Sequence, residues 1–225
     1  MTRQKTKSSF LLLLATISLF LVWRSPVRSS VRAPEAPLSY GILIDSSGSM
    51  RQDMKRVLAA ARAIVSSNSP EDETFIVRFI SSDKIESVHE FTRDKDALLK
   101  VLKDFYTEGG QTAIIDALYV SADYLAQKRS NSGDGRRNVL VLITDGEERG
   151  SSYKLTELLT SLREKQIQVY SLAYPNRVRE HSREKYEKAL KLLNTLVQET
   201  GGKLLTVEES SEFEVKTGEL INLLR

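Results

Sequence analysis

The sequence predicts an α/β protein with a doubly wound, mostly parallel sheet, helices on both faces and one short antiparallel edge strand. Two observations predict this class. Short apolar runs alternate with segments whose apolar residues recur at helical spacing, from residue 40 to the end of the chain. The run "NVLVLIT" at 138–144 contains no charged residue, as expected of a strand buried on both faces. Repeated alternation of strand and helix favours a parallel sheet with helices on both faces.

The predicted elements follow in order along the chain. The segment "YGILI" at 40–44 is a strand, and apolar residues at helical spacing follow between Met54 and Val65. A hairpin is expected next, because "FIVRFI" at 75–80 is apolar and "IESVHEFT" at 85–92 alternates as a half-solvated strand would. The remaining expected elements are strands at 138–144, 167–173 and 203–207 and helices at 94–105, 113–127, 153–165, 180–199 and 211–224.

An export segment precedes the predicted domain. Residues 1–9 are basic and contain no acid, and the run from Phe10 to Trp23 is uncharged. This run fits the core of a signal peptide better than a bilayer-spanning helix, which needs about 20 residues. Small residues before Pro34 provide a cleavage site, but the positive charges that follow the apolar run oppose its export. We expect residues 1–33 to be a signal peptide or an uncleaved membrane anchor, and the protein to be periplasmic, secreted or on the cell surface.

The exported part, a linker at 34–38 and a domain at 39–225, is slightly acidic. Residues 1–33 contain six of the 33 Lys and Arg residues and none of the 30 Asp and Glu residues, so the remainder has a net charge of about −3. We predict no nucleic-acid binding, because domains that bind nucleic acids display a basic surface. The chain has no cysteine, which excludes disulfides and thiolate metal sites and suits a bacterial envelope protein.

Oxygen-bearing side chains follow two predicted strands and precede one predicted helix. Asp45, Ser47 and Ser49 come after the first strand, Thr112 ends the loop "GGQT", and Asp145 follows the fourth strand. Ligands of open α/β sheets bind at the carboxyl ends of strands, so we expect these residues to meet. The set offers carboxylates and hydroxyls without nitrogen or sulfur, which suits magnesium, manganese or calcium and not zinc or copper.

The same residues, in this order, resemble the von Willebrand factor type A (VWA) domain and its metal-ion-dependent adhesion site (MIDAS). The pattern of that site is Asp-x-Ser-x-Ser, then a Thr after a glycine-rich loop, then an Asp, and all five positions are present. The resemblance covers about residues 38–225. It implies that these five residues hold one divalent cation, Mg²⁺ or alternatively Mn²⁺ or Ca²⁺, with some contacts through water.

The resemblance also implies a function, the metal-dependent binding of another protein. A coordination position left to water can accept a carboxylate, so an Asp or Glu of the partner would complete the octahedral coordination that Mg²⁺ prefers. Side chains around the ion are then expected to select the partner. The predicted rim consists of Met50, Gln111, Glu147, Glu148 and Arg149.

Simpler interpretations are open at each motif. Ser49 is also suited to cap a helix that begins near Arg51, and Asp145 with Gly146 is also typical of an ordinary turn. A bound ion could be structural, in a scaffold or assembly subunit that uses other surfaces of the domain. A site with all its ligands could also be inactive.

No enzymatic function is expected. Neither His89 nor His181 lies at a motif-bearing strand end, and the chain has no nucleophile elbow and no phosphate-binding glycine loop. Metal-assisted hydrolysis is the least unfavourable enzymatic alternative, because a Mg²⁺ site polarises phosphate. It would require a general base, for which Glu147 and Glu148 are the only nearby candidates.

Overall fold

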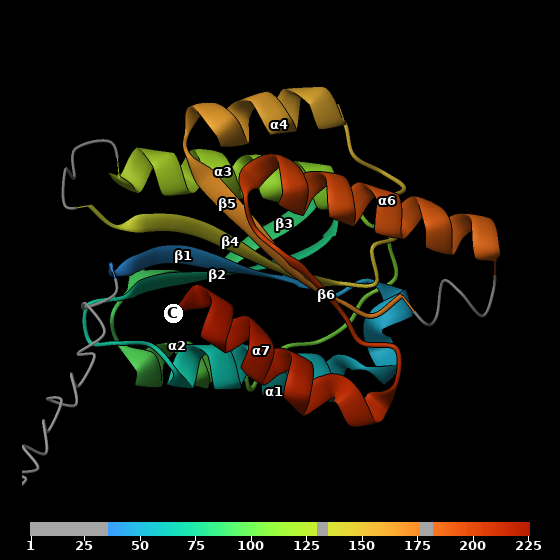
Figure 1. Ribbon diagram of the computed structural model, residues 1–225. Coiled ribbons are helices and arrows are strands. Elements are labelled where there is room, and N and C mark those ends of the chain that lie inside the picture. The colour runs from blue at the N-terminus through green and yellow to red at the C-terminus, as the bar shows by residue number, and fades with distance from the viewer. Residues whose placement is uncertain (1–35, 130–134, 176–181) are drawn as a thin grey trace, which may run out of the picture. The chain divides into compact units, whose positions relative to one another are not determined.

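A six-stranded sheet forms the centre of the computed structural model, which describes residues 36–129, 135–175 and 182–225. The strand order is β3-β2-β1-β4-β5-β6 (Figure 1). All neighbouring strands are parallel except β2 and β3, which are antiparallel, so the predicted fold class is confirmed. The edge strand β3 has nine residues and is therefore not short. The strands are β1 (Leu38–Asp45), β2 (Glu73–Ser81), β3 (Lys84–Thr92), β4 (Arg137–Thr144), β5 (Ile167–Ala173) and β6 (Leu204–Thr206).

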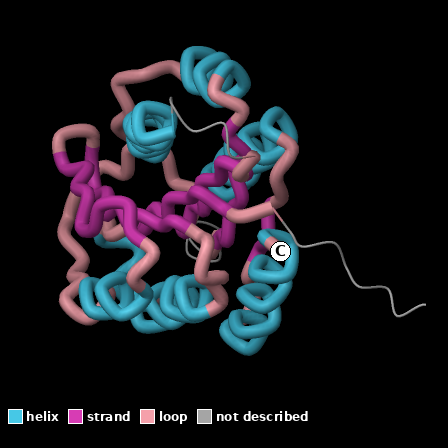
Figure 2. The backbone as a smooth tube through the Cα atoms, turned by 90° about the vertical axis from the view of Figure 1, so that its left-hand side faces the viewer, coloured by secondary structure: helices cyan, strands magenta, loops and turns pink. Residues whose placement is uncertain are grey.

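Helices cover both faces of the sheet. Figure 1 shows α1, α2 and α7 on one face and α3, α4 and α6 on the other, and Figure 2 shows the two helical layers with the sheet between them. The α-helices are α1 (Met54–Ser66), α2 (Lys95–Val101), α3 (Ile114–Arg129), α4 (Leu155–Glu164), α6 (Arg183–Thr200) and α7 (Phe213–Leu224). Two short 3-10 helices, η1 (Gly48–Gln52) and η2 (Ser210–Glu212), precede α1 and α7.

The core consists of two apolar clusters, one on each face of the sheet. Tyr40 and Ile42 of β1 pack with residues of α1, α2 and α7, whereas Leu43 packs with residues of α3, α4 and α6. Successive residues of a strand point to opposite faces, so one apolar strand serves both clusters. At Gly41 a Cβ atom would lie only 2.3 Å from Cζ of Phe75, so the glycine leaves room for that aromatic ring.

The differences from the sequence-based expectations lie at element ends. Helix α2 ends at Val101, four residues earlier than expected, because the chain turns at 102–104. Helix α6 begins at Arg183, and residues 180–181 of the expected helix lie outside the described residues. No helix in the described part of the chain is long and apolar enough to cross a membrane. The predicted export segment at 1–33 lies outside that part.

The direction in which the chain adds strands reverses beside β1. The chain passes from β1 through α1 to β2 on one side, whereas β4 lies on the other side of β1 and continues through α4 to β5. Strands β1 and β4 are direct parallel neighbours, with Ile44 opposite Ile143. Open α/β sheets bind ligands at the carboxyl ends of the strands beside such a reversal. The topology therefore points to the segments after Asp45 and Thr144.

Candidate functional site

Two buried aspartates stand at the carboxyl ends of the central strands. Asp45 is the last residue of β1, and Asp145 directly follows β4. Their exposed fractions are 0% and 1%. An isolated buried carboxylate is costly because it loses its hydration, and two buried carboxylates also repel each other. The arrangement therefore needs a compensating positive charge or proton.

Asp45 is held by donors from two segments. The backbone amide of Ser47 donates to Oδ1 at 2.9 Å, and the hydroxyl of Thr144 donates to Oδ2 at 2.6 Å. Burial, and then the negative charge of Asp145, raise the pKa of Asp45 from 3.8 to about 7, against the lowering effect of these hydrogen bonds. In the metal-free protein this carboxyl group therefore binds a proton near neutral pH.

Asp145 has one carboxylate oxygen without a donor. Oδ1 accepts the amide of Glu147 at 3.0 Å, whereas Oδ2 is buried and accepts no hydrogen bond from the described residues. Burial raises the pKa of Asp145, although the Glu147 amide and the Ser49 hydroxyl lower it. Folded proteins rarely leave a buried polar atom unpaired, and an oxygen without a protein donor is commonly a ligand of an ion or a water molecule. Oδ2 therefore has the chemistry and the burial of a ligand for a cation or a water molecule.

The two serines bring hydroxyl groups to the same place. Their Oγ atoms are 3.0 Å apart, and Ser47 is buried. Ser49 lies inside η1, and α1 begins only at Met54 with Asp53 at its N-cap position. The interpretation of Ser49 as a cap of α1 is therefore wrong, and its hydroxyl is turned toward Ser47 instead.

Thr112 ties the third segment to the other two. It is 3% exposed, and its carbonyl oxygen accepts the amides of Arg149 at 2.9 Å and Gly150 at 3.2 Å. The loop before Thr112 is joined to the end of β1 by a hydrogen bond from the Glu108 amide to the Ser46 carbonyl at 3.0 Å. Backbone hydrogen bonds thus tie the three predicted segments to one another at the carboxyl ends of β1 and β4.

The gathered donors fit a hard divalent cation. They comprise two carboxylates and three hydroxyls, all oxygen, which is the ligand chemistry of magnesium, manganese and calcium. The described residues contain no group of three or more His, Cys, Asp and Glu that could hold a metal, so hydroxyls would have to complete the coordination. The unpaired Oδ2 of Asp145 is consistent with that assignment.

The structure contradicts the predicted rim at Met50 and shows a structural role for Glu148. Met50 is 1% exposed and belongs to the apolar core. It lies in η1, whose turn directs this side chain inward and not toward a partner. Glu148 accepts the amide of Ile115 at 3.1 Å and the amide of Ser151 at 2.9 Å, so it holds its own loop against the first turn of α3. Of the other rim residues, Gln111 and Arg149 are exposed.

Two residues near the site were missed by sequence analysis. Thr144 had a detectable signal, since it is the polar end of an otherwise apolar strand beside Asp145. Lys185 of α6 contacts Glu147, with Nζ 3.5 Å from the carboxylate. No sequence pattern indicated Lys185, because α4 and β5 separate it from Glu147 in the sequence. Only the packing of α6 brings the two residues together.

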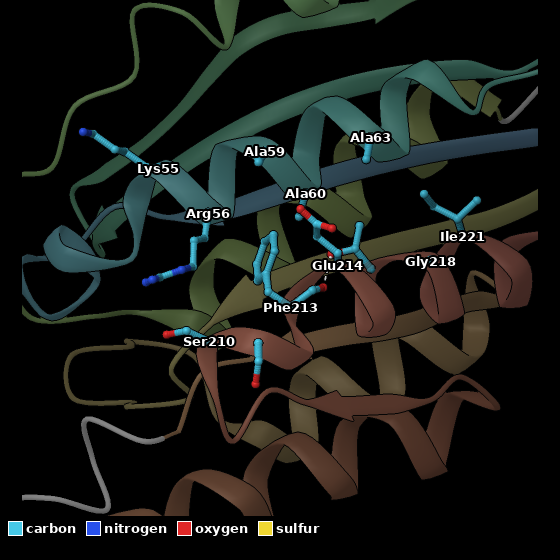
Figure 3. A pocket seen from close by; sticks show the side chains of 12 residues that line it. Lys55, Arg56, Ala59, Ala60, Ala63, Ser210, Phe213, Glu214, Gly218 and Ile221 are labelled. Carbon is cyan, nitrogen blue, oxygen red and sulfur yellow. Dashed lines mark hydrogen bonds between the residues drawn. The ribbon is translucent and has the colours of Figure 1, made fainter.

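A groove elsewhere on the surface lies away from these residues. It has a volume of about 660 Å³ and runs between α1 and α7 (Figure 3). Figure 3 shows Lys55 and Arg56 toward one end and Ile221 toward the other, with Ala59, Ala60 and Ala63 of α1 along the groove. Its lining includes the hydroxyls of Ser210, Ser211 and Thr217 but only one carboxylate, that of Glu214. The strand ends bring two buried carboxylates together and are therefore the better candidate site.

A family model covers most of the chain. Residues 41–216 match the model described as the von Willebrand factor type A domain. The sequence has no match among curated proteins. The family match includes all five residues of the predicted metal site.

Solved structures share the fold but few residues with the chain. BatB of Bacteroides thetaiotaomicron, a conserved hypothetical protein, is 18% identical with a TM-score of 0.62, over 83% of this chain and 98% of that one. An aerotolerance-related membrane protein of Bacteroides fragilis is 20% identical with a TM-score of 0.62, over 82% and 98%. Proximal thread matrix protein 1 of the mussel byssus, with a zinc-occupied MIDAS motif, is 17% identical with a TM-score of 0.66, over 84% and 48%. These TM-scores show a common fold.

Proposed function

The chain belongs to the von Willebrand factor type A domain family, and we propose that it is a divalent-metal-dependent protein-binding module of the cell envelope. Asp45, Ser47, Ser49, Thr112 and Asp145 would hold one ion, Mg²⁺ or alternatively Mn²⁺ or Ca²⁺. An acidic side chain of the partner would bind to that ion. The observation that carries the proposal is the buried Oδ2 of Asp145, which accepts no hydrogen bond from the described residues although it lies beside a second buried carboxylate.

The charge balance of the donors supports recognition of an acid. Two carboxylates neutralise the charge of a divalent cation, and hydroxyls add ligands without adding charge. A cation with few anionic ligands retains a strong affinity for a further carboxylate. When bound, the ion supplies this electrostatic attraction, while Asp45 and Asp145 orient it and the hydrogen bonds from Ser47 and Thr144 keep Asp45 in place.

The surroundings of the site favour binding over catalysis. A hydrolase would need a general base with a carboxylate free to take a proton. Glu147 instead contacts both Arg149 and Lys185, and Glu148 accepts amides of its own loop and of α3. Both candidate bases are thus occupied in stabilising the loop. We therefore propose a binding module without enzymatic activity.

The envelope location rests on the leader and on the relatives. Residues 1–33 have the charge and apolar pattern of a signal peptide or membrane anchor. A structure of the same fold comes from an aerotolerance-related membrane protein. We propose that the domain is exported and acts in the periplasm, at the cell surface or as a secreted protein.

Calorimetric titration with Mg²⁺ and Mn²⁺ tests the metal site. The matched pair of variants is Asp45→Ala and Asp123→Ala, since Asp123 is partly exposed on α3 and pairs with Lys165. We expect saturable binding to the wild type and to Asp123→Ala, and no binding to a folded Asp45→Ala protein. Absence of binding to folded wild type would show that the motif is only a turn. If Asp45→Ala no longer unfolds cooperatively in thermal melts, the ion is structural and the scaffold function is favoured.

A further inference from the structure

Helix α6 packs directly against the turn that follows Asp145. Gly146 has φ of +84°, and a Cβ atom there would lie 2.9 Å from Cδ1 of Leu193 and 3.0 Å from Cβ of Ala189. Side chains four residues apart lie on one face of a helix, so Lys185 is on the face of Ala189, one turn closer to the helix start. Close packing at Gly146 thereby fixes Lys185 beside the metal-site loop.

Two cations converge on one carboxylate oxygen in this loop. Lys185 Nζ is 3.5 Å from Oε1 of Glu147, and an Nη2 atom of Arg149 contacts the same Oε1. The Glu147 side chain is 14% exposed, whereas those of Arg149 and Lys185 are 47% and 51% exposed. The Glu147 carboxylate therefore lies mostly beneath the protein surface, whereas the two cations are exposed to solvent. One negative charge for two positive charges leaves the cluster with an excess of one positive charge.

The cluster is attached to the proposed metal site by short backbone links. The Glu147 amide donates to Oδ1 of Asp145 at 3.0 Å, and the Arg149 amide donates to the carbonyl of Thr112 at 2.9 Å. The backbone on both sides of Glu147 is thus hydrogen-bonded to residues of the site, which places Glu147 and the two cations that contact it beside that site.

We propose that Arg149 and Lys185 form a second subsite, which recognises a second acidic side chain of the partner segment. One carboxylate of that segment would bind the metal ion, and the other would bind between the two cations. The inference rests on the proposed function, and it extends it from a partner with an acid to a partner with two acids a few residues apart.

The charge arrangement gives the physical reason. Because Arg149 and Lys185 share a single oxygen, their mutual repulsion is only partly compensated in the free protein. An incoming carboxylate would balance the excess charge, and an arginine can bind a second carboxylate through nitrogens that Glu147 leaves free. Another ion pair at the same end of the sheet differs in this respect. Lys84 and Glu108 form a one-to-one pair with similar exposure, 40% and 42%, and offer no excess charge.

The test compares peptides that carry one or two acids. The probes are acetylated, amidated glycine peptides containing either one Asp or an Asp followed by a Glu two or three positions later. Binding to the full chain in Mg²⁺ at low salt is followed by NMR chemical shifts. The test variant is Arg149→Gln with Lys185→Gln. The matched control is Arg163→Gln with Lys188→Gln, which removes two exposed cations that pair with Glu199 and Glu184 outside this cluster.

We expect a two-acid peptide to bind the wild type and the control about fivefold more tightly than the one-acid peptide, as for one or two exposed ion pairs. In the test variant the two peptides should bind equally, while Mg²⁺ still binds saturably and the protein still unfolds cooperatively in thermal melts. If the one-acid peptide binds but the second acid adds nothing to the wild type, or if its effect survives in the test variant, the second subsite is refuted while the metal-dependent function stands. If Mg²⁺ binds and neither peptide does, acid recognition itself is refuted and the subsite with it.

Discussion

The stability of the metal-free protein should fall as the pH rises through neutrality. Burial and the charge of Asp145 raise the pKa of Asp45 from 3.8 to about 7 in the folded state. Between these values the folded protein binds a proton that the unfolded chain does not, so the free energy of unfolding decreases with increasing pH. The full shift corresponds to about 4 kcal/mol, of which about 3 kcal/mol falls between pH 5 and pH 8.

Urea denaturation in a chelating buffer measures this effect at the two pH values. The Asp45→Asn variant keeps the shape of the side chain and does not titrate at this position, so its stability should lose the part of the pH dependence that Asp45 contributes, while the buried Asp145 retains its own part. Asp123→Asn, at a partly exposed position, should behave as the wild type. Saturating Mg²⁺ should stabilise the wild type more at pH 8 than at pH 5, because the ion competes with protons for the carboxylates.

Two results would refute this reasoning. The first is a metal-free wild type that is as stable at pH 8 as at pH 5. The second is an Asp45→Asn variant that retains the full pH dependence, which would assign the effect to other groups. Either result would mean that the two carboxylates are better solvated or farther apart than their burial and contacts indicate.

Three further changes separate the metal site from the fold. Ser49→Ala should weaken Mg²⁺ binding at least about tenfold in calorimetry without lowering the metal-free stability, since it removes a proposed ligand and no core contact. Gly146→Ala should destabilise the protein by about 1–3 kcal/mol in urea, because φ is +84° and the new methyl group would meet Ala189. Asp72→Asn should cost about 1–3 kcal/mol by weakening the contact with Arg225 at 2.5 Å, while calorimetry finds Mg²⁺ affinity unchanged because the pair lies at the other end of β1.

The fold was predictable because its signals are local and repeated. The strand "YGILI" has side chains that serve both faces of the sheet, and the uncharged strand at 138–144 is buried as its composition predicts. The meeting of Asp45 and Asp145 was also predictable, because parallel strands bring their carboxyl ends to one edge. The motif spacing alone could not predict the raised pKa of Asp45, because that pKa depends on the burial of Asp45 and on the neighbouring charge of Asp145.

The rim was less predictable than the site. Met50 and Glu148 were predicted to face a partner because they lie close to the motifs in the sequence. The direction of a side chain, however, depends on the local turn. Met50 is directed into the core by η1, and Glu148 is directed to the amide of Ile115 by the loop. Conversely, Lys185 reaches the rim only because α6 packs against Gly146, a contact between distant parts of the chain.

The proposed site combines two charge arrangements of opposite sign. Without an ion, Asp45 and Asp145 offer no positive charge to an acidic partner, whether or not Asp45 carries a proton, and the exposed Arg149 and Lys185 alone offer only a weak, salt-sensitive attraction. With an ion, both regions attract carboxylates. Binding of metal and partner should therefore reinforce each other, and linkage requires that a partner that binds the loaded form more tightly raises the metal affinity by the same factor. Metal affinity measured with and without a two-acid peptide should increase by the factor by which Mg²⁺ strengthens peptide binding, and a peptide that bound equally in chelator would place recognition outside the ion.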